Sequence, residues 1–330
     1  MEKTPLVTNV VIAYNNADTI QPCLESVLGQ DYLRMQTIVV SDKGSTDGTD
    51  DRIRELLTKT PGRFETLSIP HLGRSAARNF GWRHGDGEVV FFADGDDVYN
   101  SNYLSRAIGA IGGEKTGCVC VTGASLVEGD GLASRMLRVY SLVQVQRRKK
   151  SGFRPSWAWV YTRRALEEAN GYDERLSQAE DKDLFERVQG LGYKAAVVDG
   201  INWSHRRASS TRAYFRKSLL GGVRRVPYLA KHRSFGGFMR ATAIVWILAL
   251  AFALQFFFEW SLLVAFFGVL AFLTFRGLDT AALVWREVPH KTDLVLYPFF
   301  NLATHAVSAL GVVAGLFADL RQPRPQERIT

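Results

Sequence analysis

The longest apolar stretch of the chain lies near its C-terminus, and it constrains the fold more than any other feature. Residues Ala241–Phe275 contain only Gln255 and Glu259 as strong polar interruptions. A bilayer core of about 30 Å takes about 20 helical residues, so this stretch is too long for one ordinary span. We therefore predict a tight hairpin that turns near Gln255–Trp260.

A second apolar stretch, Leu294–Leu320, supplies a further span. We expect residues 276–293 to form a polar and apolar connector. The C-terminal unit at 241–320 then contains two or three transmembrane helices and is followed by a tail at 321–330. Arg and Lys occur in both the connector and the tail, so the side of the membrane that holds the C-terminus stays open.

The first 200 residues alternate short apolar runs with helical patterns and polar turns. This rhythm predicts an α/β domain with an open, mostly parallel, doubly wound sheet. Ligands bind such sheets at the carboxyl ends of the strands, where Asp42, Asp94 and Asp96 fall. The expected strands are Val7–Tyr14, Thr37–Ser41, Phe64–Ile69, Glu88–Ala93, Gly117–Gly123 and Trp157–Tyr161. The expected helices are one that ends at Leu28 and those at about Asp50–Thr58, Arg74–His84 and Glu180–Leu191.

The basic residues gather beside the apolar C-terminal unit. The chain has a formal net charge of +8, and Arg and Lys cluster at 147–150 and across 206–240. Residues 211–233 mix aromatic, aliphatic and basic side chains, as in a helix on an anionic membrane face; a solvated basic helix is the alternative. No helix-turn-helix, zinc-finger or aromatic single-strand motif accompanies the charge, so we expect no nucleic-acid partner.

The cysteines and the N-terminus indicate a reducing compartment. Cys23, Cys118 and Cys120 are too few for a disulfide framework, and the alternation in Cys118-Val-Cys120 favours packing within a strand over metal binding. The N-terminus has no basic segment followed by a long apolar region, so it does not read as a signal peptide. We therefore expect a multi-pass protein of the cell membrane with a cytoplasmic N-terminal domain.

The acidic sequence Asp94-Gly95-Asp96-Asp97 directly follows an apolar strand. Two carboxylates one residue apart can hold a divalent cation together, and oxygen ligands suit Mg²⁺ or Mn²⁺. Such a cation can neutralise a diphosphate and stabilise it as a leaving group. Acidic triplets are also common in turns, so a structural turn is the alternative for the motif taken alone.

Five segments in a fixed order give this motif its context. They are ValIleAlaTyrAsn at 11–15, SerAspLysGlySerThrAspGly at 41–48, GlyArgSerAlaAlaArgAsnPheGly at 73–81, GlyGluValValPhePheAlaAspGlyAspAsp at 87–97 and GluAsp at 180–181. Together they resemble glycosyltransferase family 2, a large inverting family with the GT-A fold, over roughly residues 7–205. The resemblance implies a GT-A nucleotide-sugar-binding catalytic domain at 1–205. The clustered charge predicts that a basic membrane-interface segment follows at 206–240.

The resemblance also implies roles for single residues on the donor side. Tyr14 and Asn15 sit where the family's first strand meets the nucleotide base, and Asp42 matches a carboxylate that binds the base or ribose. Arg74 and Arg78 lie in the segment that lines the donor pocket near the phosphates. Structural alternatives exist: Asp42 can be a turn residue beside Gly44, and the two arginines can form salt bridges on a helix face.

On the metal and acceptor side, Asp94 and Asp96 match the family's metal-binding pair, with Asp96 the expected direct ligand. His205 sits where several members place another metal or diphosphate contact. Asp181 matches the family's catalytic base. The residue type suits this role, since a positioned carboxylate can deprotonate an acceptor hydroxyl. A charge at a helix N-terminus is the structural alternative for Asp181.

The apolar unit and the basic segment favour a lipid-linked or membrane-proximal acceptor, either polyprenyl phosphate or a polyprenyl-diphosphate glycan. Arg206, Arg207 and Arg212 are available for a lipid phosphate. Residues 206–240 hold no Gln/Arg-x-x-Arg-Trp motif of the processive polysaccharide synthases, so we expect non-processive transfer. Lys43 departs from the family, which often has an acidic residue or Asn there.

Other classes of function stay in view. A sugar nucleotidyltransferase would need a Gly-rich basic loop after the first strand, where this chain has Tyr14-Asn15-Asn16-Ala17. A non-catalytic membrane assembly subunit that retains the fold, or a subunit of a chain-extending polysaccharide synthase, are the remaining alternatives. The sequence leaves open the sugar, the choice between a UDP- and a GDP-sugar, and the oligomeric state.

Overall fold

The computed structural model describes residues 4–319, except for 114, 123–124, 128–130, 152–158, 200–202, 206–209, 233–241, 243–249 and 251–260. The chain forms two compact units. The first comprises Met1–Glu128 and Gln144–Arg207, and the second comprises Gly129–Val143 and Ala208–Thr330. Residues 1–205 were expected to form one continuous domain, whereas the two units interleave, because residues 133–143 pack with the C-terminal helices.

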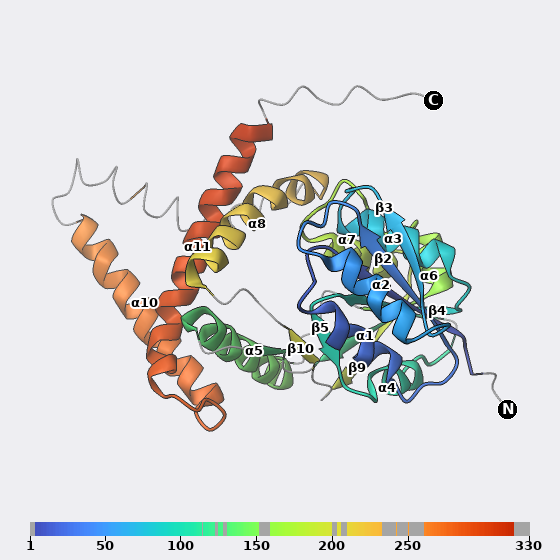
Figure 1. The fold of residues 1–330 in the computed structure, drawn as a ribbon. Helices are drawn as coiled ribbons and strands as arrows, with labels where there is room; N and C mark the ends of the chain where they lie inside the picture. Colours follow the sequence, from blue (N-terminus) through green and yellow to red (C-terminus); the bar gives the residue numbers. More distant parts are fainter. Residues whose placement is uncertain are drawn as a thin grey trace. The chain divides into compact units, whose positions relative to one another are not determined.

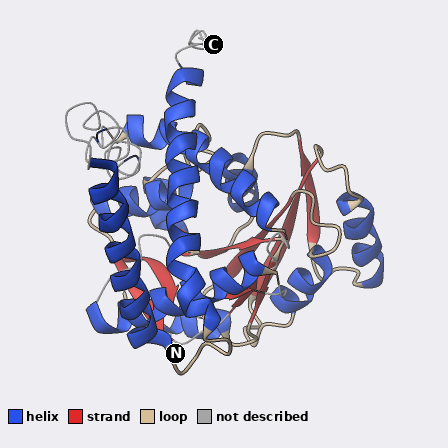
Figure 2. Ribbon diagram, turned by 90° about the vertical axis from the view of Figure 1, so that its left-hand side faces the viewer, coloured by secondary structure: helices blue, strands red, loops and turns tan. Residues whose placement is uncertain are grey.

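The first unit is built on a seven-stranded sheet with the order β3-β2-β1-β4-β8-β6-β9 (Figures 1 and 2). All neighbours run parallel except β8, which is antiparallel to β4 and to β6. The expected open, mostly parallel sheet is thereby confirmed. The strands are β1 Val7–Ala13, β2 Met35–Asp42, β3 Glu65–Ile69, β4 Val89–Asp94, β6 Thr116–Thr122, β8 Val160–Thr162 and β9 Lys194–Asp199.

Helices cover both faces of this sheet. Val11 and Phe91 pack on the side of α1 (Ile20–Leu28), α2 (Thr49–Lys59) and α4 (Tyr103–Gly109). Their neighbours Val10 and Phe92 pack on the side of α3 (Arg74–His84), α6 (Arg163–Glu168) and α7 (Glu180–Gly190). Alternate side chains of buried parallel strands point to opposite faces, which explains why these strands are apolar throughout.

The close approach of α3 to the sheet depends on a glycine. A Cβ atom added at Gly81 would lie 2.4 Å from Cγ1 of Val10 and 3.0 Å from Cγ2 of Val40. Real side chains do not reach such distances, so only Gly at this position lets α3 lie directly on β1 and β2. Gly81 stands one turn after Arg78 and thus sets the height of that arginine above the sheet.

The carboxyl ends of β1, β2 and β4 meet at one edge. Ile12 pairs with Asp94, and Ala13 pairs with Ser41, which precedes Asp42. The chain changes direction across the sheet between β1 and β4, because β2 and β3 lie on one side of β1 and β4 lies on the other. Such a switch point opens a crevice at the carboxyl ends of the strands, where ligands of doubly wound sheets bind.

A small second sheet lies in the same unit. It consists of β5 (Asp97–Tyr99), β10 (Trp203–His205) and β7 (Ser125–Val127), in that order. In the antiparallel pair of β5 and β10, His205 lies opposite Asp97. This register brings the backbone of His205 beside the end of the acidic motif.

The second unit is helical, and its core joins four helices. The apolar side chains of Met136, Val139 and Val143 on α5 (Leu132–Ser151) pack with Leu294 and Tyr297 on α11 (Thr292–Asp319). Val284 of α10 (Ser261–Val284) and Tyr214 of α8 (Thr211–Lys231) complete the cluster, in which the rings of Tyr214 and Phe300 stack. Arg135 forms a two-pronged ion pair with the buried Asp293. The sequence does not predict α5.

The helix α8 lies along α11 (Figure 1), and glycines allow the contact. A Cβ atom at Gly222 would lie 2.1 Å from the carbonyl oxygen of Ser308, and one at Gly311 would lie 2.1 Å from that of Leu219. The glycine side of α8 therefore packs on a protein helix, while Leu219 and Leu220 of the same helix are exposed; its predicted contact with a membrane face stays a prediction. Arg212, Arg216, Lys217 and Arg224 are on its exposed side.

Two helices of this unit are long and apolar enough to cross a membrane, at Phe267–Val284 and Thr292–Phe317. The expected connector at 276–293 is wrong in its first half, because α10 continues to Val284 and holds Arg276 against Asp279 at 3.5 Å. The expected turn at Gln255–Trp260 lies outside the described residues. Many large apolar side chains of both helices are exposed, among them Phe267, Phe275, Phe299 and Phe317.

Candidate active site

The acidic motif and the expected base meet at one buried arginine. Asp94 is the last residue of β4, and Asp181 lies in the first turn of α7. Arg78 on α3 donates from Nη2 to Asp94 at 2.8 Å and from Nη1 to Asp181 at 3.1 Å. The same Nη1 donates to Glu180 at 3.2 Å. One guanidinium therefore fixes carboxylates that come from two distant segments of the sequence.

Aromatic rings enclose this guanidinium. The Cζ atom of Arg78 lies 5.4 Å from the centroid of the Trp159 ring and 5.1 Å from that of Tyr172. The side chain is only 1% exposed. Burial disfavours the charge, but the facing carboxylates of Asp181 and Asp94 hold the pKa of Arg78 above its ordinary value. The arginine is therefore a permanent cation inside the site.

Asp181 has the electrostatics of a base that works near neutral pH. Burial raises the pKa of its carboxyl group to about 6, the neighbouring charges of Glu180 and Asp94 add to this rise, and Arg78 opposes it. The side chain still has 24% of its surface exposed, so an acceptor can reach it. A carboxylate tuned in this way can accept a proton from a reacting hydroxyl.

The helix α3 also holds the loop that carries the chain into α7. Oγ of Ser75 donates to the carbonyl of Leu176 at 2.8 Å. The amide of Asn79 donates to the carbonyl of Tyr172 and accepts from its backbone N–H, both at 2.8 Å. Arg74 reaches Glu180 at 3.1 Å from a position with 48% of its side chain exposed. The polar residues on the buried side of α3 thus position the segment that ends in Glu180 and Asp181.

The residue that precedes this carboxylate pair is strained. Ala179, the N-cap of α7, has φ 63° and ψ 20°, the left-handed region that a residue with a Cβ atom rarely adopts. No side chain caps the helix there. Such a conformation persists only where the surroundings enforce it, and here the contacts to α3 do so. With Ala179 in this conformation, the backbone directs Glu180 and Asp181 toward Arg78.

The loops after β1 and β2 form one rim at the open edge of the sheet. Asn15, with φ 52°, accepts from the backbone N–H of Thr46 at 2.8 Å, and its own N–H donates to Oγ of Ser45 at 3.2 Å. Asp42, at the end of β2, accepts from the N–H of Gly44 and lies 2.8 Å from Nδ1 of His71. The ring of Tyr14 lies against that of His71.

Asp94 and Asp96 fit a divalent cation by their chemistry. Both carboxylates stand at the carboxyl end of β4 and are partly exposed. Among the described residues, Asp94, Glu180 and Asp181 surround Arg78 and Arg74, so a cation beside Asp94 would lie in an acidic environment. Within the described residues no three His, Cys, Asp or Glu side chains already converge as metal ligands. The backbone of His205 lies opposite Asp97, whereas its side chain is outside what the structure describes.

The structure thus joins some of the expected site residues and separates others. Asp94, Asp181, Arg74 and Arg78 form one cluster, and Tyr14, Asn15 and Asp42 form the rim. Arg78 was expected in the segment that lines the donor pocket near the phosphates; its guanidinium is buried and contacts Asp94, Glu180 and Asp181, and its role toward the donor stays a prediction. Arg206 and Arg207 lie outside the described residues, and Arg212 is exposed on α8 in the second unit.

Sequence reasoning missed several residues of the site. They are Ser75, Asn79, His71, Trp159 and Tyr172. The contacts of Glu180 with Arg74 and Arg78 were not predicted either. One signal for two of them was present: Ser75 and Asn79 are polar residues four positions apart on a helix, so they share a face with Arg78. Cys118 and Cys120, in contrast, are buried in the core as expected.

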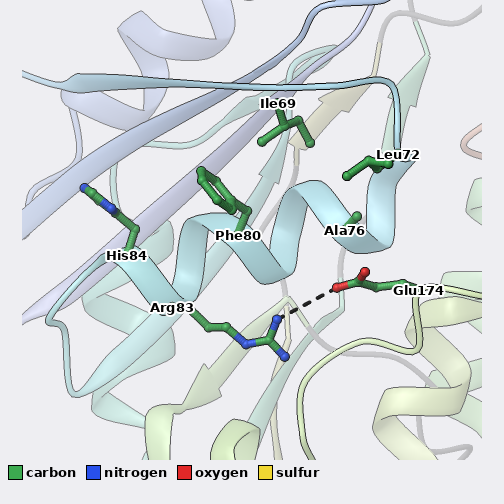
Figure 3. Close-up of a pocket in the computed structure, with 7 residues that line it drawn as sticks. All are labelled: Ile69, Leu72, Ala76, Phe80, Arg83, His84 and Glu174. Atoms are coloured by element: carbon green, nitrogen blue, oxygen red, sulfur yellow. Dashed lines mark ion pairs between the residues drawn. The ribbon is translucent and has the colours of Figure 1, made fainter. Parts of the chain in front are cut away.

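A separate hollow of about 420 Å³ lies on another side of α3. Ile69, Leu72, Ala76, Phe80, Arg83, His84 and Glu174 line it, and Arg83 and Glu174 form an ion pair across it (Figure 3). Arg74 and Arg78 are not part of its lining. This hollow is therefore distinct from the carboxylate cluster.

Comparisons with known proteins bear on the family of this chain. Residues 8–169 match the family Glycosyl transferase family 2. Glycosyltransferase AglE of Haloferax volcanii is 32% identical over 127 residues, which cover 38% of this chain and 39% of that protein. Succinoglycan biosynthesis protein ExoO of Rhizobium meliloti is 29% identical over 215 residues, or 60% of this chain and 59% of that protein. The chain spans less than two thirds of either relative.

A solved structure shares the fold. The mannosyltransferase PcManGT from Pyrobaculum calidifontis, in complex with GDP-Man and Mn²⁺, superposes with a TM-score of 0.61 at 23% identity. The match covers 96% of this chain and 88% of that one. The sheet with its helices is therefore the GT-A fold that the resemblance implies. The acidic motif and the segment that carries Arg78 both lie within the matched residues, and residues 8–169 of the chain are a glycosyl transferase family 2 domain.

Proposed function

We propose that the protein is an inverting glycosyltransferase that moves a sugar from a nucleotide-diphosphate sugar to a membrane-bound acceptor. The observation that carries this proposal is the single guanidinium of Arg78, which joins Asp94 of the acidic motif to Asp181. A partly exposed carboxylate with a raised pKa thereby stands beside the place where a diphosphate can be held. Acid–base work and leaving-group stabilisation are the two tasks that this transfer needs.

In the reaction, Asp181 takes the proton of the acceptor hydroxyl. The acceptor oxygen forms a bond to the anomeric carbon on the face opposite the leaving group, and the bond from that carbon to the diphosphate oxygen breaks. The nucleoside diphosphate leaves with the electron pair. Arg78 does not touch the reacting atoms; it positions Asp181 and Asp94.

Asp94 and Asp96 would hold a divalent cation, Mn²⁺ or Mg²⁺, with His205 as a further candidate ligand. When bound, this cation supplies charge stabilisation to the departing diphosphate. Support comes from the oxygen-rich side chains at the end of β4 and from the mannosyltransferase of the same fold that holds GDP-Man and Mn²⁺. The same observations support a UDP- or GDP-sugar as donor.

The apolar second unit supports a membrane location and a lipid-linked acceptor. Two helices can cross a bilayer, and α8 exposes Arg212, Arg216 and Arg224 close to them in that unit, where they could meet lipid phosphates. We place the catalytic unit on the cytoplasmic side. Between the two lipids considered, we favour a polyprenyl-diphosphate glycan, because its hydroxyl needs a base, whereas a phosphate oxygen is already ionised.

The test uses the purified full chain in detergent. It is incubated with labelled UDP- and GDP-sugars, Mn²⁺ or Mg²⁺, and either polyprenyl phosphate or a polyprenyl-diphosphate sugar. We expect labelled glycolipid with one donor, formed faster on the diphosphate sugar and abolished by EDTA. Donor binding without transfer to any lipid would favour the non-catalytic assembly subunit instead.

Asp181→Asn should abolish turnover and leave donor binding within about twofold of wild type. The amide keeps the shape of the side chain but cannot accept the proton, and loss of a general base costs about 10²–10⁴-fold in rate. Initial rates and donor titrations measure the two effects. Glu186→Gln, an exposed residue on the same helix, is the matched control and should keep its rate. An unchanged rate in the Asp181 variant would refute its role.

The rate should fall as pH decreases through about 6. Because burial raises the pKa of Asp181 to about 6, the carboxyl group becomes protonated below that pH and can no longer act as a base. An ordinary aspartate would stay ionised until about pH 4. The pH profile of kcat/KM, with donor affinity measured at the same pH values, checks this. A profile that stays flat down to pH 5 contradicts it.

Arg78→Met should destabilise the protein far more than Arg74→Met. The first change leaves three carboxylates without their shared cation, and breaking a buried ion pair costs about 3–5 kcal/mol in the free energy of unfolding. Arg74 is half exposed, and such pairs contribute at most about 1 kcal/mol. Denaturant titrations of both variants under identical conditions give the comparison. Equal losses would show that Arg78 has no special role.

A further inference from the structure

The outer side of α3 is open and apolar, whereas its other sides are covered. Ala77 and Gly81 face the sheet, and Asn79 holds the loop that leads to α7. Ala76 and Phe80 lie one turn apart on the remaining side, where they line the hollow of about 420 Å³ (Figure 3). A surface helix normally turns polar side chains to water on such a side. The outer side of α3 therefore has the composition of a side that another protein covers.

The hollow continues from α3 onto the edge of the sheet. Ile69 ends β3, which is the edge strand of the sheet as far as the structure describes it, and Ile69 lines the hollow together with Ala76. Both of these residues are buried, whereas Leu72 is 61% exposed and Phe80 is 49% exposed. Isolated apolar side chains are ordinary on a protein surface, but here two large ones stand around one hollow with apolar walls. Such a grouping is typical of a surface that binds another protein.

Two ion pairs of mixed sign stand beside these apolar side chains. Nη1 of Arg83 lies 3.8 Å from Oε1 of Glu174, and Nε2 of His84 lies 3.4 Å from Oε2 of Glu65. All four side chains are about half exposed. The distance from Arg83 to Glu174 exceeds that of a hydrogen bond, so this guanidinium can turn toward another carboxylate. Glu174 is itself fixed, because its Oε1 accepts from the amide of Asn79 at 2.8 Å.

The mixed charge decides among the possible occupants of the hollow. A nucleic acid, an anionic lipid surface or an acidic peptide would meet the carboxylates of Glu65 and Glu174, and a basic peptide would meet Arg83. A second copy of the chain presents both signs in the same arrangement. In a contact with two-fold symmetry, each pair of residues meets twice, once on either side of the axis. Arg83 of each protomer can then reach Glu174 of the other.

We propose that the hollow on α3 is the contact through which two copies of this protein associate. Leu72 and Phe80 of one protomer pack into the hollow of the other. Arg83 and Glu174 exchange partners across the two-fold axis. The dimer thus joins the outer sides of two α3 helices, whose inner sides carry Arg78. This contact goes beyond the proposed glycosyl transfer and does not depend on it.

The experiment measures the mass of the purified full chain in detergent by light scattering, over a range of protein concentrations. Wild type should contain two chains. Phe80→Asp should weaken the association about 30-fold or more, as is usual when a central aromatic side chain of an interface is lost, and should contain one chain at the same concentration. Leu33→Asp is the matched control, because Leu33 is 95% exposed in the loop before β2, and should keep two chains. Thermal unfolding shows that each variant is folded.

Charge reversal tests whether the partner is a second copy. Arg83→Glu alone places like charges at both symmetric contacts, and so does Glu174→Arg alone, so each variant should contain one chain. A mixture of the two variants restores opposite charges at both contacts. With a different affinity tag on each variant, the mixture should yield a heterodimer that carries both tags.

Three results would overturn the proposal. The first is a wild-type chain that stays monomeric at every concentration. The second is a Phe80→Asp variant that still dimerises like wild type, because the contact then lies elsewhere on the protein. The third is a mixture of the charge-reversed variants that forms no heterodimer. A monomeric wild type that instead retains a different protein, which Phe80→Asp loses, would assign the hollow to that partner and overturn the dimer as well.

Discussion

The site depends on a buried charge that has to be shared. Removing a guanidinium from water is unfavourable unless carboxylates and rings replace its hydration, and Arg78 has Asp94, Glu180, Asp181 and two aromatic rings around it. Because the donors of the guanidinium lie in one plane, each carboxylate has little freedom to move. The end of β4 and the start of α7 are therefore held together by one side chain that neither element contains.

Several local features serve this one interaction. Gly81 lets α3 approach the sheet, and this fixes the depth of Arg78. Ser75 and Asn79 hold the loop before α7, and Ala179 accepts an unfavourable backbone conformation so that the carboxylate pair faces the arginine. Strain at Ala179 is stable only because the contacts to α3 outweigh it. The helix α3 thus supports the carboxylate cluster from one side.

The sequence predicts the sheet well, because strands buried on both faces are apolar at every position and end in polar turns. The sequence does not predict strands that form only by pairing with segments far away along the chain. The strands β5, β7 and β10 have three residues each, and their partners lie far away along the chain. The surroundings of Arg78 were hidden for the same reason, since its carboxylates come from positions 16, 102 and 103 residues away. The helix α5 was not predicted from the sequence, because the basic residues at 147–150 break the apolar pattern at its C-terminal end.

The charge of the cluster bears on the acceptor as well as on the donor. Among the described residues, the carboxylates of Asp94, Glu180 and Asp181 gather around Arg78 and Arg74. An ionised carboxylate repels a lipid phosphate that approaches it, and it repels a neutral sugar hydroxyl far less. A phosphate acceptor would also gain nothing from a base whose pKa is raised. Within the proposed function, the carboxylates beside Asp181 therefore favour a hydroxyl, whose lipid phosphates stay away from the cluster, over an anionic nucleophile.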